Sequence, residues 1–288
     1  MPVGSSTIQR IKNKITDDLS GWYDKNEAKN IASLLIEHIC QMDKTRQISE
    51  ASYVPGDDEL NEINRLFRKL MSGMPIQYVL GETEFYGRKF IVSPTVLIPR
   101  PETEEVVEVA INQCKNMLHP RILDIGTGSG IIAVTLAAEL NDAEVFASDI
   151  ADDILRVAKR NASLHQVQMS FICHDLWKQQ DDLPGNLDCI VSNPPYVTEK
   201  EKKDMHQNVL NYEPSEALFV PDDDHVRFYK QIARVAKQKL HAGGMVVCEI
   251  NDAFAKESMK CFADENFGNI FVNKDLNKKN RILTARKP

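Results

Sequence analysis

Seven short apolar runs, alternating with longer amphipathic segments, dominate the chain from residue 121 to its end. Strands are predicted for the apolar runs, at 121–125, 144–148, 169–173, 187–192, 244–250, 269–273 and 281–285. Helices are predicted where apolar residues recur at helical spacing, at 103–118, 130–140, 152–164, 226–241 and 252–265. Because strands that alternate with helices pair in parallel and are covered on both faces, we expect an α/β domain with a mostly parallel, seven-stranded sheet.

The chain before residue 95 has the pattern of a small helical bundle. Three amphipathic helices are expected: one over Ile8 to Leu19, a second capped by Asn26 and a third capped by Asp57. Since no candidate catalytic cluster falls among them, we interpret residues 1–74 as a domain that binds or positions a partner.

A short linker follows this bundle. Residues 84–92 form two short strand patterns that turn at Gly87 and Arg88, which predicts a β-hairpin. We therefore divide the chain into three parts: a helical domain at 1–74, a linker with the hairpin at 75–98 and an α/β domain at 99–288.

A glycine-rich turn follows the first strand of the α/β domain. The stretch Gly126-Thr127-Gly128-Ser129-Gly130 carries the pattern G-x-G-x-G, and Ile131 stands where the dinucleotide-binding pattern G-x-G-x-x-G requires glycine. Glycines let a ligand approach the backbone closely, and the following helix start offers N–H groups. The five residues of this turn are therefore candidates for binding a nucleoside that carries an amino-acid tail.

Acidic residues follow the next two strands. Asp149 ends the second strand and is predicted to accept hydrogen bonds from both hydroxyls of a ribose. Asp175 follows the third strand, and its carboxylate is predicted to accept an adenine amino hydrogen while the backbone N–H of Leu176 donates to a ring nitrogen. Either acid alone also fits a solvated loop or a helix cap. Together, after the glycine turn, they indicate a bound adenosyl group.

The fourth strand ends in Asn193-Pro194-Pro195-Tyr196. Two prolines stop a strand, and they also hold a backbone carbonyl in a fixed position. A planar amino or amide nitrogen is a poor nucleophile because its lone pair is delocalised. The Asn193 side-chain oxygen and the Pro194 carbonyl are predicted to accept its two hydrogens, with Tyr196 packed against its planar group. The motif therefore indicates alkylation of such a nitrogen, with no general base needed beforehand.

Charge and residue usage exclude several classes of function. The net charge of −7 opposes binding of nucleic acid over a large surface, because such binding requires a basic surface. No apolar run approaches the roughly 18 residues of a membrane span. Residues 1–16 are basic, as in a transit peptide, but they continue into a helical pattern, so we expect a cytoplasmic protein. The six cysteines and seven histidines show no ligand spacing, and we assign no metal.

These motifs resemble the HemK/PrmC family of peptide chain release factor glutamine N5-methyltransferases, which belongs to the class I adenosylmethionine-dependent methyltransferases. The blocks that carry the resemblance follow one another along the chain: Pro75-Ile76-Gln77-Tyr78-Val79-Leu80-Gly81, Glu84-Phe85-Tyr86-Gly87, Val96-Leu97-Ile98-Pro99-Arg100-Pro101-Glu102-Thr103-Glu104, Asp124-Ile125-Gly126-Thr127-Gly128-Ser129-Gly130, Ser192-Asn193-Pro194-Pro195-Tyr196 and Tyr212-Glu213-Pro214.

The resemblance implies S-adenosylmethionine as cofactor and the glutamine of the Gly-Gly-Gln motif of a peptide chain release factor as substrate. It implies that the glycine turn, Asp149 and Asp175 with Leu176 hold the cofactor, and that Asn193 to Tyr196 binds the target amide. Arg100 and Glu102 would lie near the cofactor or the mouth of the site. The resemblance leaves open whether Leu176 or Trp177 covers the adenine. It further implies an N-terminal domain that recognises the release factor. We expect a monomer.

Two other functions remain compatible with the motifs. The first is methylation of an exocyclic amino group of nucleic acid, adenine N6 or guanine N2, because such enzymes share the pattern of Asn193 to Tyr196. That reaction needs a flipped base and a basic channel, which the acidic balance of the chain opposes. The second is a non-catalytic protein that binds an adenosyl group.

Overall fold

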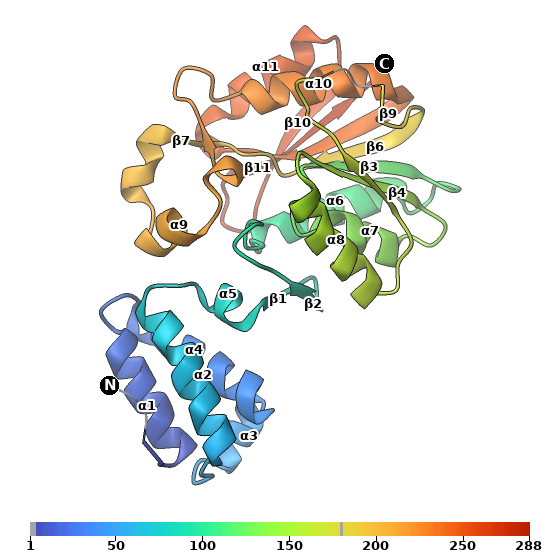
Figure 1. Cartoon of the computed structure of the whole chain (residues 1–288). Helices are drawn as coiled ribbons and strands as arrows, with labels where there is room; N and C mark the ends of the chain where they lie inside the picture. Colours follow the sequence, from blue (N-terminus) through green and yellow to red (C-terminus); the bar gives the residue numbers. More distant parts are fainter. Residues whose placement is uncertain (1–3, 179–180) are drawn as a thin grey trace. The chain divides into compact units, whose positions relative to one another are not determined.

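The computed structural model describes residues 4–178 and 181–288 (Figure 1). These residues form two compact units, which are described separately. The first consists of the described residues up to Glu82 together with His206–Tyr212, and the second of Thr83–Met205 and Glu213–Pro288. None of the helices in the described residues combines the length and the apolar character needed to cross a bilayer.

The first unit is a helical bundle, as predicted. Its N-terminal part contains the helices α1 (Ile8–Leu19), α2 (Lys25–Cys40), α3 (Lys44–Ser49), α4 (Asp57–Met71) and α5 (Ile76–Leu80). The predicted apolar positions form its core, because Ile11, Ile15, Leu35, Ile63 and Leu70 are buried in one cluster. The short helices α3 and α5 were not predicted, since neither is long enough to repeat an apolar pattern.

Both predicted caps of this bundle were wrong by a small shift. Asp24, and not Asn26, caps α2: its Oδ1 accepts from the backbone N–H groups of Asn26 at 2.8 Å and of Glu27 at 3.0 Å. Gly56 precedes α4, and the Glu59 carboxylate accepts from its N–H at 2.8 Å. The carboxylate at the third helical position therefore satisfies the backbone donor just before the helix, in place of the side-chain cap expected from Asp57.

A short helix from late in the chain completes the first unit. This helix, α9 (Gln207–Tyr212), was not predicted. His206 lies just before it, with its Nε2 2.8 Å from the carbonyl of Trp22, and Tyr212 donates its hydroxyl to the carbonyl of Ser72 at 2.7 Å. Both contacts lie at one end of the bundle, because the Trp22 ring packs beside Gly73, the residue after Ser72.

The second unit is built on the predicted seven-stranded sheet. Its strands are β3 (Arg121–Ile125), β4 (Glu144–Asp149), β5 (Ser170–Cys173), β6 (Leu187–Ser192), β9 (Leu240–Glu249), β10 (Gly268–Lys274) and β11 (Asn280–Arg286). They are ordered β10-β11-β9-β6-β3-β4-β5. The strand β11 is antiparallel to both of its neighbours, β10 and β9, and the other neighbouring pairs of this sheet are parallel. All seven predicted strands are confirmed.

Helices cover both faces of the sheet (Figure 1). One face packs against α10 (Arg227–Lys239) and α11 (Ala255–Asp264), and the other against α6 (Glu102–Cys114), α7 (Ile131–Glu139) and α8 (Asp152–Leu164). Side chains alternate between the two: Leu123 and Ile190 belong to the first core, and Ile122 and Val191 to the second. Because both of their faces are covered, the central strands β3, β4, β6 and β9 have largely apolar sequences.

The predicted hairpin is present, with its turn one residue earlier than expected. Its strands are β1 (Glu82–Phe85) and β2 (Arg88–Ile91). Tyr86 and Gly87 form the turn with φ of 50° and 68°, the conformation that suits a two-residue hairpin loop. Beyond β6 lie short elements that the sequence did not predict: β7 (Val197–Thr198), η1 (Glu199–Asp204), η2 (Ser215–Ala217) and β8 (Phe219–Val220). The helix predicted at 252–265 begins as the 3₁₀ turn η3 (Asp252–Phe254) and continues as α11.

One buried side chain joins the hairpin to the glycine turn. Asn161 on α8 is fully buried. Its Oδ1 accepts from the N–H of Ile91 at 2.7 Å, and its Nδ2 donates to the carbonyls of Ile91 at 2.9 Å and Ser129 at 2.7 Å. All three groups lose a partner when this amide is removed, so a single residue fixes two loops at once.

We expect Asn161→Ala to lower the free energy of unfolding by about 3 kcal/mol, because buried backbone groups are left without partners. Asn112→Ala, which removes an exposed amide from α6, is the matched control and is expected to change stability by less than about 0.5 kcal/mol. Chemical denaturation followed by circular dichroism measures both. Equal stabilities of the two variants would contradict the role given to Asn161.

Candidate active site

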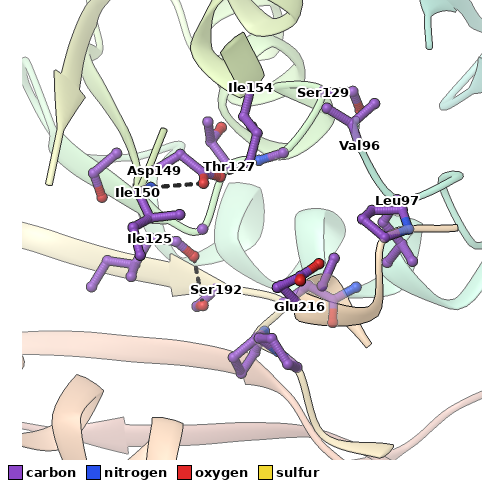
Figure 2. Close-up of a pocket in the computed structure, with 18 of the residues that line it drawn as sticks. Val96, Leu97, Ile125, Thr127, Ser129, Asp149, Ile150, Ile154, Ser192 and Glu216 are labelled. Atoms are coloured by element: carbon purple, nitrogen blue, oxygen red, sulfur yellow. Dashed lines mark hydrogen bonds between the residues drawn. The ribbon is translucent and has the colours of Figure 1, made fainter. Parts of the chain in front are cut away.

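A cavity of about 500 Å³ opens where the parallel strands end (Figure 2). Residues that follow four neighbouring strands line it: the glycine turn after β3, Asp149 at the end of β4, His174 after β5 and Asn193 after β6. This is the edge at which ligands bind in open parallel sheets. Two further segments, 95–100 and 214–217, contribute another part of the wall.

The glycine turn presents an open backbone to this cavity. Gly126 and Gly128 have φ of 72° and 54°, and a Cβ added to either would meet no atom within 4 Å. Thr127 and Ser129 also line the cavity. Gly130 does not. A Cβ there would lie 3.0 Å from the Cβ of Ala158, so this glycine allows α7 to pack closely on α8.

A buried acid lies beneath the turn. Asp124 on β3 is fully buried and accepts a hydrogen bond from the Thr127 hydroxyl at 2.7 Å through Oδ2. Its other oxygen has no partner among the described residues. Burial raises the pKa of Asp124 to about 7. The carboxyl group therefore gains a proton near neutrality, which removes the cost of a buried charge.

Asp149 occupies a fixed position at the cavity wall. Its Oδ2 accepts from the N–H of Gly128 at 2.9 Å, and its Oδ1 accepts from the N–H of Ile150 at 2.8 Å. Burial raises the pKa of Asp149, and these two hydrogen bonds oppose the shift. Each carboxylate oxygen has a second lone pair, so two hydroxyls of a ligand can still be accepted, as the ribose prediction requires.

The residues after β5 divide between cavity and surface. Leu176, which is buried, and Trp177, which is 42% exposed, both line the cavity. Trp177 packs edge to face on Phe228, with ring centroids 4.8 Å apart. Asp175 does not line the cavity. Its Oδ1 accepts from the N–H of Trp177 at 3.0 Å and so shapes the loop that presents both apolar side chains.

The motif after β6 is also divided. Asn193, Pro194 and Pro195 line the cavity, whereas Tyr196 does not. The Tyr196 hydroxyl donates to Oε1 of Glu249 at 2.8 Å. Ser192, just before the motif, donates to the carbonyl of Ile125 at 2.7 Å and so ties the end of β6 to the end of β3 (Figure 2).

A buried glutamate joins the two additional wall segments. Glu213, whose side chain is 1% exposed, accepts from Arg100 at 2.7 Å and from the N–H of Ile98 at 3.2 Å. Arg100 lines the cavity, and Pro214 lines it from the opposite segment. No chemical role for Glu213 was predicted from the sequence, although this residue stands within one of the blocks that carry the family resemblance.

Two further residues were missed. Thr103 and Glu249 are both buried, and the Thr103 hydroxyl donates to Oε2 of Glu249 at 2.7 Å. Asn193 Nδ2 lies 3.1 Å from the same hydroxyl oxygen. The signal for Glu249 is an acid at the end of an otherwise apolar strand, a position where an unpaired charge is costly.

The ionisable groups of the wall favour a cationic ligand. Among the described residues that line the cavity, three carry carboxylates, namely Asp149, Asp153 and Glu216, and one, Arg100, carries a guanidinium. Arg100 is already paired with Glu213. An excess of carboxylates opposes a phosphate ligand and attracts a positively charged one.

Comparisons with known proteins agree with this arrangement. The PrmC N-terminal domain model matches residues 16–81, and the methyltransferase small domain model matches residues 105–218. The release factor glutamine methyltransferases of Flavobacterium psychrophilum and Bacteroides thetaiotaomicron are each 38% identical to this chain. The first alignment covers 96% of this chain and 98% of the relative, and the second 97% and 100%.

Solved structures share the fold at low sequence identity. The hMettl16 catalytic domain, solved in complex with the MAT2A 3′UTR hairpin 6, is 16% identical and superposes with a TM-score of 0.56 over 82% of this chain and 84% of its own. The T. thermophilus 16S rRNA N2 G1207 methyltransferase RsmC, solved with AdoMet and guanosine, is also 16% identical. Its TM-score is 0.51, over 72% of this chain and 50% of its own.

The raised pKa of Asp124 predicts a pH-dependent stability. Between the ordinary pKa of an unfolded aspartate and about 7, the folded protein binds more protons than the unfolded chain, so stability falls as pH rises. Asp124→Asn cannot ionise. We therefore expect its free energy of unfolding to rise relative to wild type from pH 5 to 7, by up to about 1.4 kcal/mol per pH unit, and then to level off.

Urea denaturation between pH 5 and 8, without added ligand, measures this difference. Asp142→Asn, at an exposed loop position, is the matched control and should keep a constant offset from wild type. A constant offset for Asp124→Asn as well would show that Asp124 ionises in the folded protein as it does in the unfolded chain.

Proposed function

Because the chain belongs to the family of release factor glutamine methyltransferases, we propose that it methylates the side-chain amide nitrogen of a glutamine in a peptide chain release factor. The methyl donor is S-adenosylmethionine, and the target is the glutamine of the Gly-Gly-Gln motif. The observation that supports this reaction most directly is the position of Asn193 and Pro194 on the wall of the same cavity as the open glycine turn.

The residues of the cavity fit the cofactor. The turn from Gly126 to Ser129 leaves room for a ligand against the backbone, and Asp149 can accept the ribose hydroxyls. Leu176 and Trp177 both offer apolar surface to the adenine. The carboxylates of the wall suit a ligand with a sulfonium and an ammonium group. When bound, S-adenosylmethionine supplies an electrophilic methyl group.

Two proposed cofactor residues act from behind the cavity. Gly130 supports the turn by letting α7 approach α8, and Asp175 shapes the loop that carries Leu176 and Trp177. Neither residue needs to contact the cofactor directly. Their effect on the cofactor is through the position of the neighbouring backbone.

The residues after β6 fit the second substrate. The amide nitrogen of glutamine has two hydrogens, and the Asn193 side-chain oxygen and the Pro194 carbonyl can accept one each. Both acceptors gain strength as positive charge develops on the nitrogen during attack on the methyl group. The proton leaves only after alkylation has made the nitrogen acidic, so no base has to act first. Pro195 keeps the Pro194 carbonyl from reorienting.

The substrate is assigned to protein and not to nucleic acid on two grounds. The relatives that span this chain are named for a release factor, and the helical unit matches the N-terminal domain model of that family. The net charge of −7 opposes stable binding of nucleic acid, because such binding requires basic side chains that neutralise phosphates and release their counterions. We assign recognition of the release factor to the helical residues 1–74 and catalysis to residues 99–288, with residues 75–98 as the linker between them. We further propose that the enzyme is monomeric and cytoplasmic.

The transfer reaction is tested with labelled S-adenosylmethionine and a mixture of release factor, RNA and DNA, followed by mass mapping of the methylated residue. We expect label on the Gly-Gly-Gln glutamine alone. Asn193→Ala is expected to lower turnover by about 10² or more, because a transition-state acceptor is lost, while cofactor affinity changes little. Label on RNA or DNA and none on the release factor would contradict the proposed function.

A separate prediction concerns the cofactor. We expect Asp149→Ala to raise the dissociation constant of S-adenosylmethionine by about tenfold or more, because two charge-assisted hydrogen bonds to the ribose are lost. Asp153→Ala, which removes an exposed carboxylate from the same wall, separates loss of charge from loss of these bonds. Isothermal titration calorimetry measures both variants, and equal losses would remove the ribose role of Asp149.

A further inference from the structure

The amide of Asn193 can face the substrate in two ways, and only one of them supports the proposed reaction. With Oδ1 toward the substrate it accepts a hydrogen from the target nitrogen, and with Nδ2 it offers a second donor to a group that is itself a donor. The two orientations have nearly the same shape. A group behind the Asn193 amide, on the side away from the substrate, must therefore favour one of the two orientations.

Glu249 provides the distinguishing charge. It ends β9, is 1% exposed and receives the hydroxyls of Thr103 at 2.7 Å on Oε2 and of Tyr196 at 2.8 Å on Oε1. Burial raises the pKa of Glu249, and the hydrogen bonds from Thr103 and Tyr196 together with the charge of Arg281 oppose this rise by stabilising the carboxylate. In that unprotonated form each carboxylate oxygen only accepts hydrogen bonds. The single hydroxyl proton of Thr103 therefore points toward Glu249, and toward Asn193 the same hydroxyl can only accept.

The Thr103 oxygen lies 3.1 Å from Nδ2 of Asn193. We infer that Glu249 and Thr103 are positioning residues that fix the amide of Asn193 with Nδ2 bound to Thr103 and Oδ1 left to accept the target N–H. This inference rests on the proposed function. Among the described residues, none donates a hydrogen bond to Oδ1 of Asn193, so its acceptor capacity remains for the substrate.

The arrangement joins three distant parts of the chain. Thr103 stands in the first turn of α6, Asn193 follows β6 and Glu249 ends β9, the strand paired with β6. The register of that pair places Ser192 opposite Cys248, next to the two residues concerned. Sheet register therefore brings the carboxylate to the back of the catalytic motif, where burial strengthens its hydrogen bonds.

The test compares Thr103→Val, which keeps the shape and removes the hydroxyl, with Thr103→Ser, which keeps the hydroxyl. We expect Thr103→Val to lower kcat about tenfold, because the catalytic acceptor is no longer held in one orientation, and Thr103→Ser to restore turnover to near that of wild type. Cofactor affinity, measured by calorimetry, should change less than twofold in both. If Thr103 had a purely structural role, Thr103→Val would lower the stability of the protein without a difference in kcat between the two folded variants.

Tyr229→Phe is the matched control. It removes another buried hydroxyl, which donates to the backbone carbonyl of Glu249 at 3.1 Å and takes no part in the link to Asn193. Its kcat should stay within about twofold of wild type. If Thr103→Val does not fold, Thr103→Ala replaces it, and circular dichroism identifies the folded variant. Turnover of the folded hydroxyl-free variant equal to that of Thr103→Ser would overturn the inference.

Failure of the proposed function gives a different result. Wild-type protein that methylates another substrate and no release factor would contradict the proposed function alone. The ratio of kcat between Thr103→Val and Thr103→Ser on that substrate would still decide the orientation of Asn193, because any planar amino or amide nitrogen presents the same N–H groups.

Discussion

The parallel pairing of β3 with β4 on one side and with β6 on the other determines where the remaining parts of the site lie. In this register Ile125 is opposite both Ser148 and Ser192, so the three strands end at one level. The glycine turn follows β3, Asp149 is the last residue of β4 and Asn193 follows β6. A shift of one strand by a single residue would turn its side chains to the other face and separate these groups.

The sequence predicted those parts of the molecule whose signals are local. The central strands β3, β4, β6 and β9 are largely buried, and for that reason they appear in the sequence as continuous apolar runs. A turn such as Gly126 to Gly130 and a motif such as Asn193 to Tyr196 also lie within a few consecutive residues. Elements without such a signal were missed: α3, α5 and α9 have only five or six residues each, too few for a periodic pattern.

Residue roles that depend on distant partners were beyond what the sequence could supply. Gly130 belongs to the glycine pattern, but a glycine is needed there because α8 approaches closely at Ala158. No residue near Gly130 in the sequence indicates that contact. Glu213 is separated from Arg100 by 113 positions and Thr103 from Glu249 by 146. Each of these acids appears in the sequence as an isolated charge, and only the folded chain shows which group donates a hydrogen bond to it.

The two fully buried acids at the strand ends, Asp124 and Glu249, have a consequence for how this protein tolerates mutation. Burying carboxyl groups lowers the net stability of a fold, and well-packed apolar replacements of buried polar clusters are often neutral or stabilising. A mutational scan scored by thermostability would therefore favour apolar replacements at this edge of the sheet, whereas a scan scored by methyl transfer would reject them. The two fitness landscapes should diverge most where the cavity meets the core, as expected where stability and activity compete for the same positions.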